Sequence, residues 1–205
     1  MSTSLLYHAF GIREYNYVRT QYHTGNIIFT IERKPFSNRC PWCQCKDVIR
    51  HGAIVRWFHS LPIGNKATYI ITSVPRVECK RCHITRQVNI GFADHRVTYT
   101  RALERYALAL SKHMTIQDVA IHLGLSWDTV KGMQKRYLTK RYKNLKLKDL
   151  KLIAVDEINI GKGRYLTVLL NVKTSAIVFV GEGKGSDALE PFWKKIKRKR
   201  SWVTF

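Results

Sequence analysis

The sequence lacks the features that mark membrane-spanning and secreted proteins. No stretch of its 205 residues approaches the ~20 consecutive apolar residues of a membrane-spanning helix. The N-terminus also lacks the basic and then apolar pattern of a signal peptide. These absences predict a cytoplasmic, nucleoid-associated protein whose thiols stay reduced and available to metals.

Acidic residues are also scarce. The chain has 14 Asp and Glu residues against 36 Lys and Arg residues, which gives a formal net charge of +22. A folded protein with this excess repels itself unless it meets a polyanion, and nucleic acid is the leading partner because its phosphates release counterions on binding. An anionic membrane surface is the alternative. Hydrophobic residues make up 45% of the chain, so it can bury a core and is not a disordered basic tail.

Four of the five cysteines stand in two pairs at metal-ligand spacing. Cys40 and Cys43 form one CxxC pair, and Cys79 and Cys82 form the other. Each pair can turn two thiolates onto one ion, and two pairs complete the tetrahedral four-sulfur shell that Zn²⁺ favours. Two disulfides or four reduced core thiols are the alternatives, and Cys45 is left as a bystander or a spare ligand. Three histidines rank below the cysteines as ligands: His51, His59 and His83.

The first half of the chain reads as mostly extended. Residues 1–36 are expected to be a β-rich lead-in, with a strand over the β-branched residues 26–32. Residues 37–92 are expected to form a zinc ribbon, with two short strands within residues 67–78. Pro75 predicts an edge or a break rather than a central strand, because proline cannot donate to a sheet.

Residues 93–138 change to a helical period of ~3.6 and predict three helices. Thr115 and Asp118 give the second helix a capping-box start, Gly124 permits a sharp turn, and Ser126 is a good cap for the third helix. This spacing predicts a helix-turn-helix, with a plain three-helix bundle and a solvated basic face as the alternative.

The third helix is the candidate DNA reader. Val130, Met133 and Tyr137 are expected to face inward. Five residues are expected to face outward and to reach base edges and phosphates in a major groove: Trp127, Asp128, Lys131, Gln134 and Lys135. Residues 139–150 follow as a basic linker that is expected to contact the phosphate backbone.

Residues 151–205 return to strand patterning. Three strands with short connections predict an antiparallel meander, and a helix follows from Ser186 with Pro191 in its first turn. Asp156 closes the first apolar strand, where a carboxylate is costly unless it holds a metal or pairs with a cation. Glu157 should point to the opposite face, so the two acids would not share one ion easily. A salt bridge from Asp156 to Lys or Arg is the alternative to a catalytic role.

The order of these parts resembles the zinc-ribbon DDE transposases of bacterial insertion sequences, in particular the ISL-three family. The resemblance runs from about residue 36 and is carried by several unrelated motifs in one order: both CxxC pairs, His51-Gly52, Leu61-Pro62 and residues 126–130, 155–157, 164–167 and 180–183. It implies that residues 151–205 begin a ribonuclease-H-like catalytic domain, with Asp156 as the first of three metal-binding carboxylates. The second and third carboxylates are missing, so we expect a C-terminally truncated copy that does not cleave DNA alone. Mg²⁺ or Mn²⁺ would serve only a complete catalytic domain.

The expected fold class is therefore α+β and multi-domain: a β-rich zinc ribbon, a three-helix helix-turn-helix and an incomplete ribonuclease-H-like βββα unit. The expected function is that of a transposase fragment with bound zinc, which recognises terminal inverted repeats in double-stranded DNA. A homo-oligomer could assemble on that DNA. A stand-alone zinc-dependent transcriptional regulator is the alternative from another class. An RNA-binding ribbon protein is a weaker one, because it would not need a helix-turn-helix.

Overall fold

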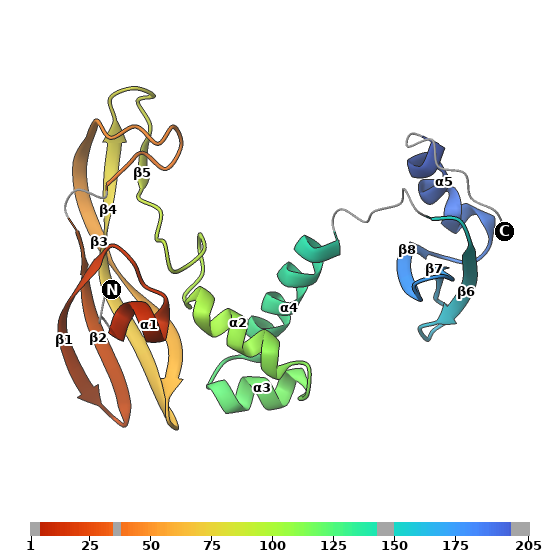
Figure 1. The fold of residues 1–205 in the computed structure, drawn as a ribbon, viewed down its shortest axis with the longest axis horizontal. Helices are drawn as coiled ribbons and strands as arrows, with labels where there is room; N and C mark the ends of the chain where they lie inside the picture. The colour runs from red at the N-terminus through yellow and green to blue at the C-terminus, as the bar shows by residue number, and fades with distance from the viewer. Residues whose placement is uncertain (1–4, 35–37, 143–149, 198–205) are drawn as a thin grey trace. The chain divides into compact units, whose positions relative to one another are not determined.

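The computed structural model describes residues 5–34, 38–142 and 150–197 (Figure 1). The chain divides into two compact units, Met1–Tyr137 and Leu138–Phe205, and each is described by itself. Both units combine strands and helices, so the predicted α+β class is confirmed. Among the described residues, no helix combines the length and the apolar character that crossing a bilayer requires.

A five-stranded sheet forms the first part of unit 1. Its strands are β1 (Tyr15–His23), β2 (Asn26–Arg33), β3 (Val48–Ile63), β4 (Lys66–Cys79) and β5 (Thr85–Gln87), in the order β1-β2-β4-β3 with β5 also on β4. β2 and β4 are parallel, and the other pairs are antiparallel. The lead-in and the ribbon region therefore share one sheet.

One apolar core joins this sheet to its N-terminal helix. The short helix α1 (Leu5–Phe10), which the sequence did not predict, buries Leu6 and Phe10. Phe10 lies against Phe29 of β2, with ring centroids 5.6 Å apart, and Phe58 of β3 lies against Phe92 at 5.2 Å. Residues on both sides of the expected boundary at residue 36 thus belong to the same core.

β4 runs without interruption through Pro75, so the predicted pair of short strands is wrong. The carbonyl of Pro75 accepts a hydrogen bond from Val88 N at 3.0 Å, on the side of the strand that faces β5. The nitrogen of a strand residue points to the same side as its carbonyl. On that side β2 pairs only as far as Thr72, and β5 starts to pair at Arg76. The missing N–H of proline therefore falls between two partners and removes no ladder hydrogen bond.

Three helices follow the sheet, as predicted: α2 (Arg101–Leu110), α3 (Ile116–Leu123) and α4 (Trp127–Tyr142). Leu103, Val119, Val130 and Met133 are fully buried between them. The inward orientation predicted for Tyr137 is wrong, because this side chain is 40% exposed. The buried stripe of α4 ends at Met133, and the later turns continue as an exposed helix.

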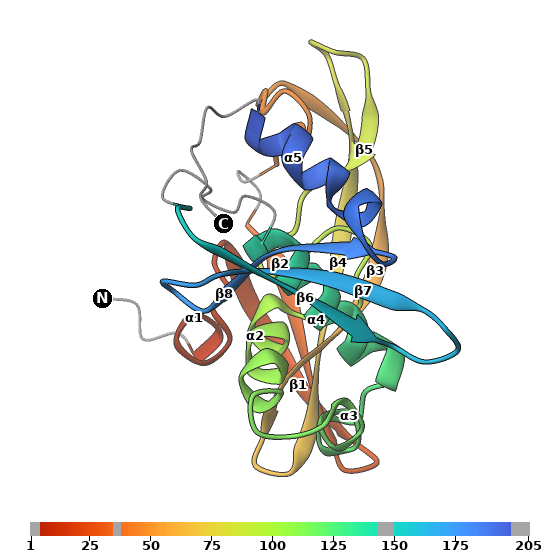
Figure 2. The same cartoon turned by 90° about the vertical axis from the view of Figure 1, so that its right-hand side faces the viewer.

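Unit 2 contains an antiparallel sheet of β6 (Ile153–Asn159), β7 (Tyr165–Asn171) and β8 (Ala176–Glu182). The 3₁₀ helix η2 (Ser186–Leu189) leads into α5 (Glu190–Lys197), which lies along one face of the sheet (Figure 2). Pro191 is in the first turn of α5, as predicted. This order of three strands and a helix does not by itself identify a ribonuclease-H-like fold.

The segment between the two units was expected to be a basic linker over residues 139–150. α4 continues as far as Tyr142, so the first four of these residues are helical. Leu150 is buried in the core of unit 2 with Leu169 and Phe192. Residues 143–149 lie outside the described residues.

Candidate metal centre and nucleic-acid interface

The two CxxC turns share one backbone construction. Gln44 N donates to the Cys40 carbonyl at 3.0 Å, and His83 N donates to the Cys79 carbonyl at 2.8 Å. The residue after each second cysteine is left-handed, with φ of 59° at Gln44 and 53° at His83. Each turn is closed on itself in this way, and its two thiols point to the same side.

The four paired thiols converge on one point. The Sγ atom of Cys43 lies 3.4 Å from that of Cys79 and 3.8 Å from that of Cys82, and the Sγ atoms of Cys40 and Cys82 are 3.6 Å apart. All four Sγ atoms lie within 4.8 Å of one another. Sulfurs bound ~2.3 Å from a tetrahedral zinc ion stand ~3.8 Å from one another, whereas the sulfurs of a disulfide are ~2.05 Å apart. The four thiols therefore fit a zinc ion, and none of the cysteines forms a disulfide.

Burial and hydrogen bonding shift the pKa values of these thiols in opposite directions. Burial raises the pKa of the Cys79 thiol, but hydrogen bonds from the backbone amides of Cys82 and Arg81 and from the thiols of Cys43 and Cys82 together lower this pKa to about 6. Burial also raises the pKa of the Cys82 thiol, and the neighbouring cysteine sulfurs add to the rise, to about 12. One thiolate thus disfavours the next, and a bound divalent cation would let all four ionise.

The other candidate ligands stay outside this group among the described residues. His51 Nε2 pairs with Glu78 Oε2 at 2.7 Å. His59 is buried elsewhere in the sheet, and His83 is exposed after the second turn. Cys45 is half-buried and does not join the four thiols.

Local hydrogen bonds fix the turn between α3 and α4. Thr115 Oγ1 accepts from Asp118 N at 3.2 Å, and the Asp118 carboxylate accepts from Thr115 N at 3.3 Å, so the predicted capping box is present. α3 ends at Gly124, whose φ of 61° is a left-handed conformation that glycine adopts without strain. Ser126 Oγ accepts from Thr129 N at 3.2 Å and so caps the start of α4.

α4 presents most of the predicted reading residues to solvent. Asp128, Lys131 and Lys135 are exposed, Trp127 is 42% exposed, and Gln134 is half-buried. The ammonium group of Lys131 lies 4.5 Å from the centroid of the Trp127 ring. This cation–π contact, made within the free protein, holds an aromatic ring and a positive charge together on the first turns of α4.

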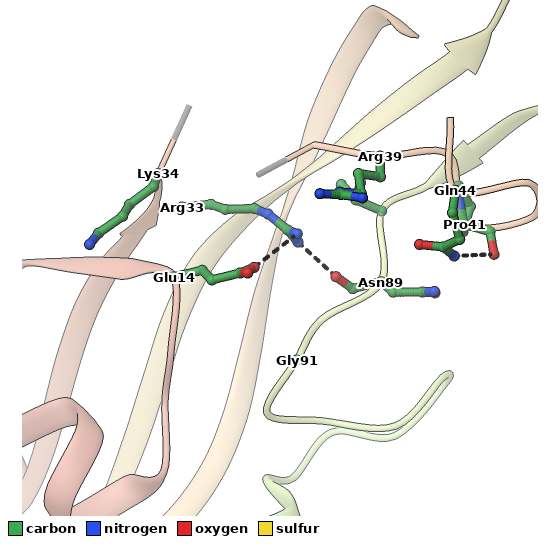
Figure 3. Close-up of a pocket in the computed structure, with 9 residues that line it drawn as sticks. Glu14, Arg33, Lys34, Arg39, Pro41, Gln44, Asn89 and Gly91 are labelled. Carbon is green, nitrogen blue, oxygen red and sulfur yellow. Dashed lines mark hydrogen bonds and ion pairs between the residues drawn. The ribbon is translucent and has the colours of Figure 1, made fainter. Parts of the chain in front are cut away.

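A cavity of ≈ 520 Å³ beside the first CxxC turn was not predicted (Figure 3). Its lining includes three cationic side chains, Arg33, Lys34 and Arg39, and one carboxylate, Glu14. Arg33 donates to the Asn89 carbonyl at 2.7 Å and lies 3.6 Å from the Glu14 carboxylate. The positive excess suits an anion such as a phosphate. No local motif could have revealed the cavity, because its residues come from three separate stretches of the chain.

Two segments of the chain match domains of one family of transposases. Residues 37–82 match the zinc finger of transposases IS204, IS1001, IS1096 and IS1165, and residues 88–138 match the helix-turn-helix domain of transposase family ISL3, the ISL-three family. The transposase for insertion sequence element IS1001 of Bordetella parapertussis is 26% identical over 163 residues, which cover 77% of this chain. These matches support an ISL3-family transposase.

The matched region covers 39% of the IS1001 transposase, so the chain spans about two fifths of that relative's length. The two family segments contain the four converging thiols and the α3–α4 turn, respectively. No solved structure matches the chain.

The third predicted site, in unit 2, is the carboxylate of Asp156. Asp156 is exposed on β6, and its Oδ1 accepts a hydrogen bond from Glu157 N at 2.8 Å. Glu157 instead accepts from Gly185 N at 2.9 Å, with Lys184 Nζ 4.0 Å away. Among the described residues, no ion pair joins Asp156 to Lys or Arg, and Asp156 belongs to no group of three or more possible metal ligands. These residues alone therefore do not fit a Mg²⁺ or Mn²⁺ ion.

Proposed function

We propose that this chain is a DNA-binding transposase polypeptide that recognises the terminal inverted repeats of an insertion sequence. The observation that carries the proposal is the α3–α4 turn, which is capped at both helices and exposes Trp127, Lys131 and Lys135 on α4. In a helix-turn-helix, the second helix enters the major groove and its N-terminal residues contact base edges.

The charge of the chain supports duplex DNA as the partner. The net charge of +22 supplies the non-specific attraction to phosphates, and the exposed residues of α4 supply side chains for base edges. Lys131 and Lys135 can contact phosphates or guanine, Gln134 suits adenine, and Asp128 suits the amino group of cytosine. Assembly of several copies on the DNA is compatible with this role.

The zinc ion has a structural role in this proposal. Cys40, Cys43, Cys79 and Cys82 would fill all four positions of a tetrahedral ion, which leaves no position for water or substrate. A closed site of this kind stabilises the fold and supplies no catalysis. The ion would hold the end of the sheet beside the cationic cavity of Figure 3.

A stand-alone transcriptional regulator is not favoured. Both matched segments come from transposases of one family, and they follow one another in the chain. A regulator would bind an operator elsewhere in the genome, whereas a transposase should prefer the repeats that flank its own gene. Competition between these two kinds of duplex would separate the two functions.

The DNA-binding proposal is tested by the salt dependence of the affinity of Lys131→Ala for an inverted-repeat duplex. If Lys131 contacts a phosphate, affinity falls and the slope of log K against log salt decreases by about one unit. Lys173→Ala is the matched control, because Lys173 is exposed in unit 2 on the hairpin between β7 and β8. An unchanged affinity and slope for Lys131→Ala, or equal losses in both variants, would contradict the proposed role of α4.

Asp156 is assigned a catalytic role by family resemblance, as the first of three metal-binding carboxylates. Strand transfer through two metal ions needs several carboxylates on ions ~3.5–4 Å apart, and among the described residues Asp156 belongs to no group of three or more possible metal ligands. We therefore expect no nicking of inverted-repeat DNA by the 205-residue polypeptide in Mg²⁺ or Mn²⁺. Metal-dependent nicking that Asp156→Ala abolishes would contradict this expectation.

A further inference from the structure

A second cavity in unit 1 lies where the sheet meets the helix-turn-helix. It has a volume of ≈ 270 Å³, below the ~300–1,000 Å³ of pockets for drug-sized ligands. Aromatic rings form one side of its lining: Trp57 and His59 of β3, Tyr69 of β4 and Tyr99 before α2. Leu125 of the α3–α4 turn and Thr129 of the first turn of α4 also line it.

Its aromatic walls are held in place by specific contacts. The rings of His59 and Tyr69 are stacked, with centroids 4.8 Å apart and planes 24° apart, and the Trp57 ring meets Tyr69 edge-on at 6.4 Å. The hydroxyl of Tyr99 accepts a hydrogen bond from Arg136, whose guanidinium also contacts Glu104. These contacts orient the rings before any ligand binds, which lowers the entropy cost of stacking on them.

The cavity adjoins the helix that is proposed to read DNA. Leu125 belongs to the α3–α4 turn, and Thr129 is in the first turn of α4, where its hydroxyl lies 2.8 Å from Ser126 Oγ. Trp127 and Lys131 emerge from the same turns of α4 toward solvent. DNA contacted by the N-terminal turns of α4 would therefore pass close to the mouth of the cavity.

The chemistry of the lining selects a base rather than a phosphate. Among the described residues, no Lys, Arg, Asp or Glu lines this cavity, although the chain has 36 Lys and Arg residues. Three cationic side chains line the cavity of Figure 3. Burial lowers the pKa of His59, so its ring is uncharged at neutral pH. Flat uncharged rings stack on the faces of nucleobases, and threonine hydroxyls can bond their edges.

We propose that this aromatic cavity receives one nucleobase, unstacked from the duplex next to the segment read by α4. The proposal rests on the DNA-binding function proposed above. Extrusion of a base costs unstacking and unpairing energy, and this cost is smallest for a base that is already unpaired. A duplex with one unpaired base at the right position should therefore bind more tightly than the fully paired duplex.

The test compares the affinity of the full chain for an inverted-repeat duplex with its affinity for the same duplex carrying a single unpaired thymine, scanned base by base. We expect one position at which the unpaired base strengthens binding. Trp57→Ala should reduce this preference by about 5- to 150-fold, the range expected for loss of one stacked base. Its affinity for the fully paired duplex should change less.

Two further variants keep the test decisive. Trp57 is 51% exposed, so its truncation should leave the fold intact, and Tyr22→Ala is the matched control because Tyr22 is 77% exposed on β1. Thr98 also lines the cavity and is exposed, so Thr98→Phe should fill the space and remove the preference without loss of a ring.

The outcomes separate this inference from the proposed function. Equal binding of paired and unpaired duplexes at every position, or a preference that survives both Trp57→Ala and Thr98→Phe, would overturn the cavity proposal and leave DNA binding intact. A failure of the full chain to bind either duplex would overturn both proposals.

Discussion

The zinc-binding turns and the helix-turn-helix lie in the same unit but are stabilised in different ways. Of the four thiol-bearing residues, only Cys40 and Cys79 are fully buried, and Trp42 within the first turn is 68% exposed. The helix-turn-helix instead buries eight residues in a contiguous apolar cluster. We therefore expect the turns to depend on a bound metal ion and the helices to depend on apolar burial. Each region should fail under a treatment that the other survives.

The largest expected effect is that of Cys79→Ser. Loss of one of four thiolates should release the zinc ion and unfold both CxxC turns, because metal-binding free energy is folding free energy at such a site. Zinc content per chain and the hydrogen exchange of residues 40–45 and 79–84 measure the two effects. The helical circular dichroism should change little, because the helix-turn-helix is stabilised by apolar burial and not by the metal ion.

Cys45→Ser is the matched control for this substitution. Cys45 is two residues beyond Cys43 but is not among the four converging thiols. The variant should keep one zinc ion per chain and the wild-type exchange pattern. Stoichiometric zinc in Cys79→Ser, or its loss in Cys45→Ser, would show that the ligand set is wrong.

Leu103→Ala should have the opposite signature. Leu103 is fully buried between α2, α3 and α4, and truncation of a buried leucine costs ~2–5 kcal/mol of unfolding free energy. Urea denaturation followed by the helical signal should show this loss, while the zinc content stays at one ion per chain. Ile121→Ala, on the 70% exposed Ile121 of α3, should change the unfolding free energy by less than ~0.5 kcal/mol. Zinc release by Leu103→Ala would mean that the two regions unfold together.

A smaller loss is expected from Thr115→Ala. This substitution removes the hydroxyl that accepts from Asp118 N at the start of α3, and such caps contribute ~1 kcal/mol. Urea denaturation measures the loss, and Gln117→Ala, at an exposed position of the same helix, is the control. Equal stability of the two variants would mean that tertiary packing, and not the capping box, positions α3.

Local signals made the metal centre and the turn predictable. The CxxC spacing, the Thr115–Asp118 box and Gly124 each act within a few residues, and the structure has each of them. Long-range pairing was not predictable in the same way. The parallel contact of β2 with β4, from Ile27 with Thr68 onward, joins segments that no turn connects. The aromatic and cationic cavities were missed for this reason, since their residues meet only after the sheet has formed.

The end of α4 shows a further limit of pattern reading. A period of ~3.6 placed Tyr137 on the buried stripe, but the fully buried residues of this stripe end at Met133. Periodicity identifies which face of a helix can be buried and not how far its partners reach. Asp156 is a similar case, because an acid at a strand position indicates a site only when other ligands join it.

The smallest expected effect concerns the contact between the sheet and the segment before α2, where His59 of β3 bridges to Tyr99. Burial lowers the pKa of His59 from its ordinary value of 6.5, so the folded chain keeps the ring neutral while the unfolded chain protonates it as pH falls below that value. The unfolded state then binds more protons, and stability decreases with falling pH, by at most ~1.4 kcal/mol per pH unit for one group.

His59→Gln should lose this part of the acid sensitivity relative to the wild type, when urea denaturation is compared at pH 7.5 and pH 5. His95→Gln, at an exposed position, should keep a profile parallel to the wild type. Parallel profiles for all three proteins would show that His59 is not a source of acid sensitivity at this contact.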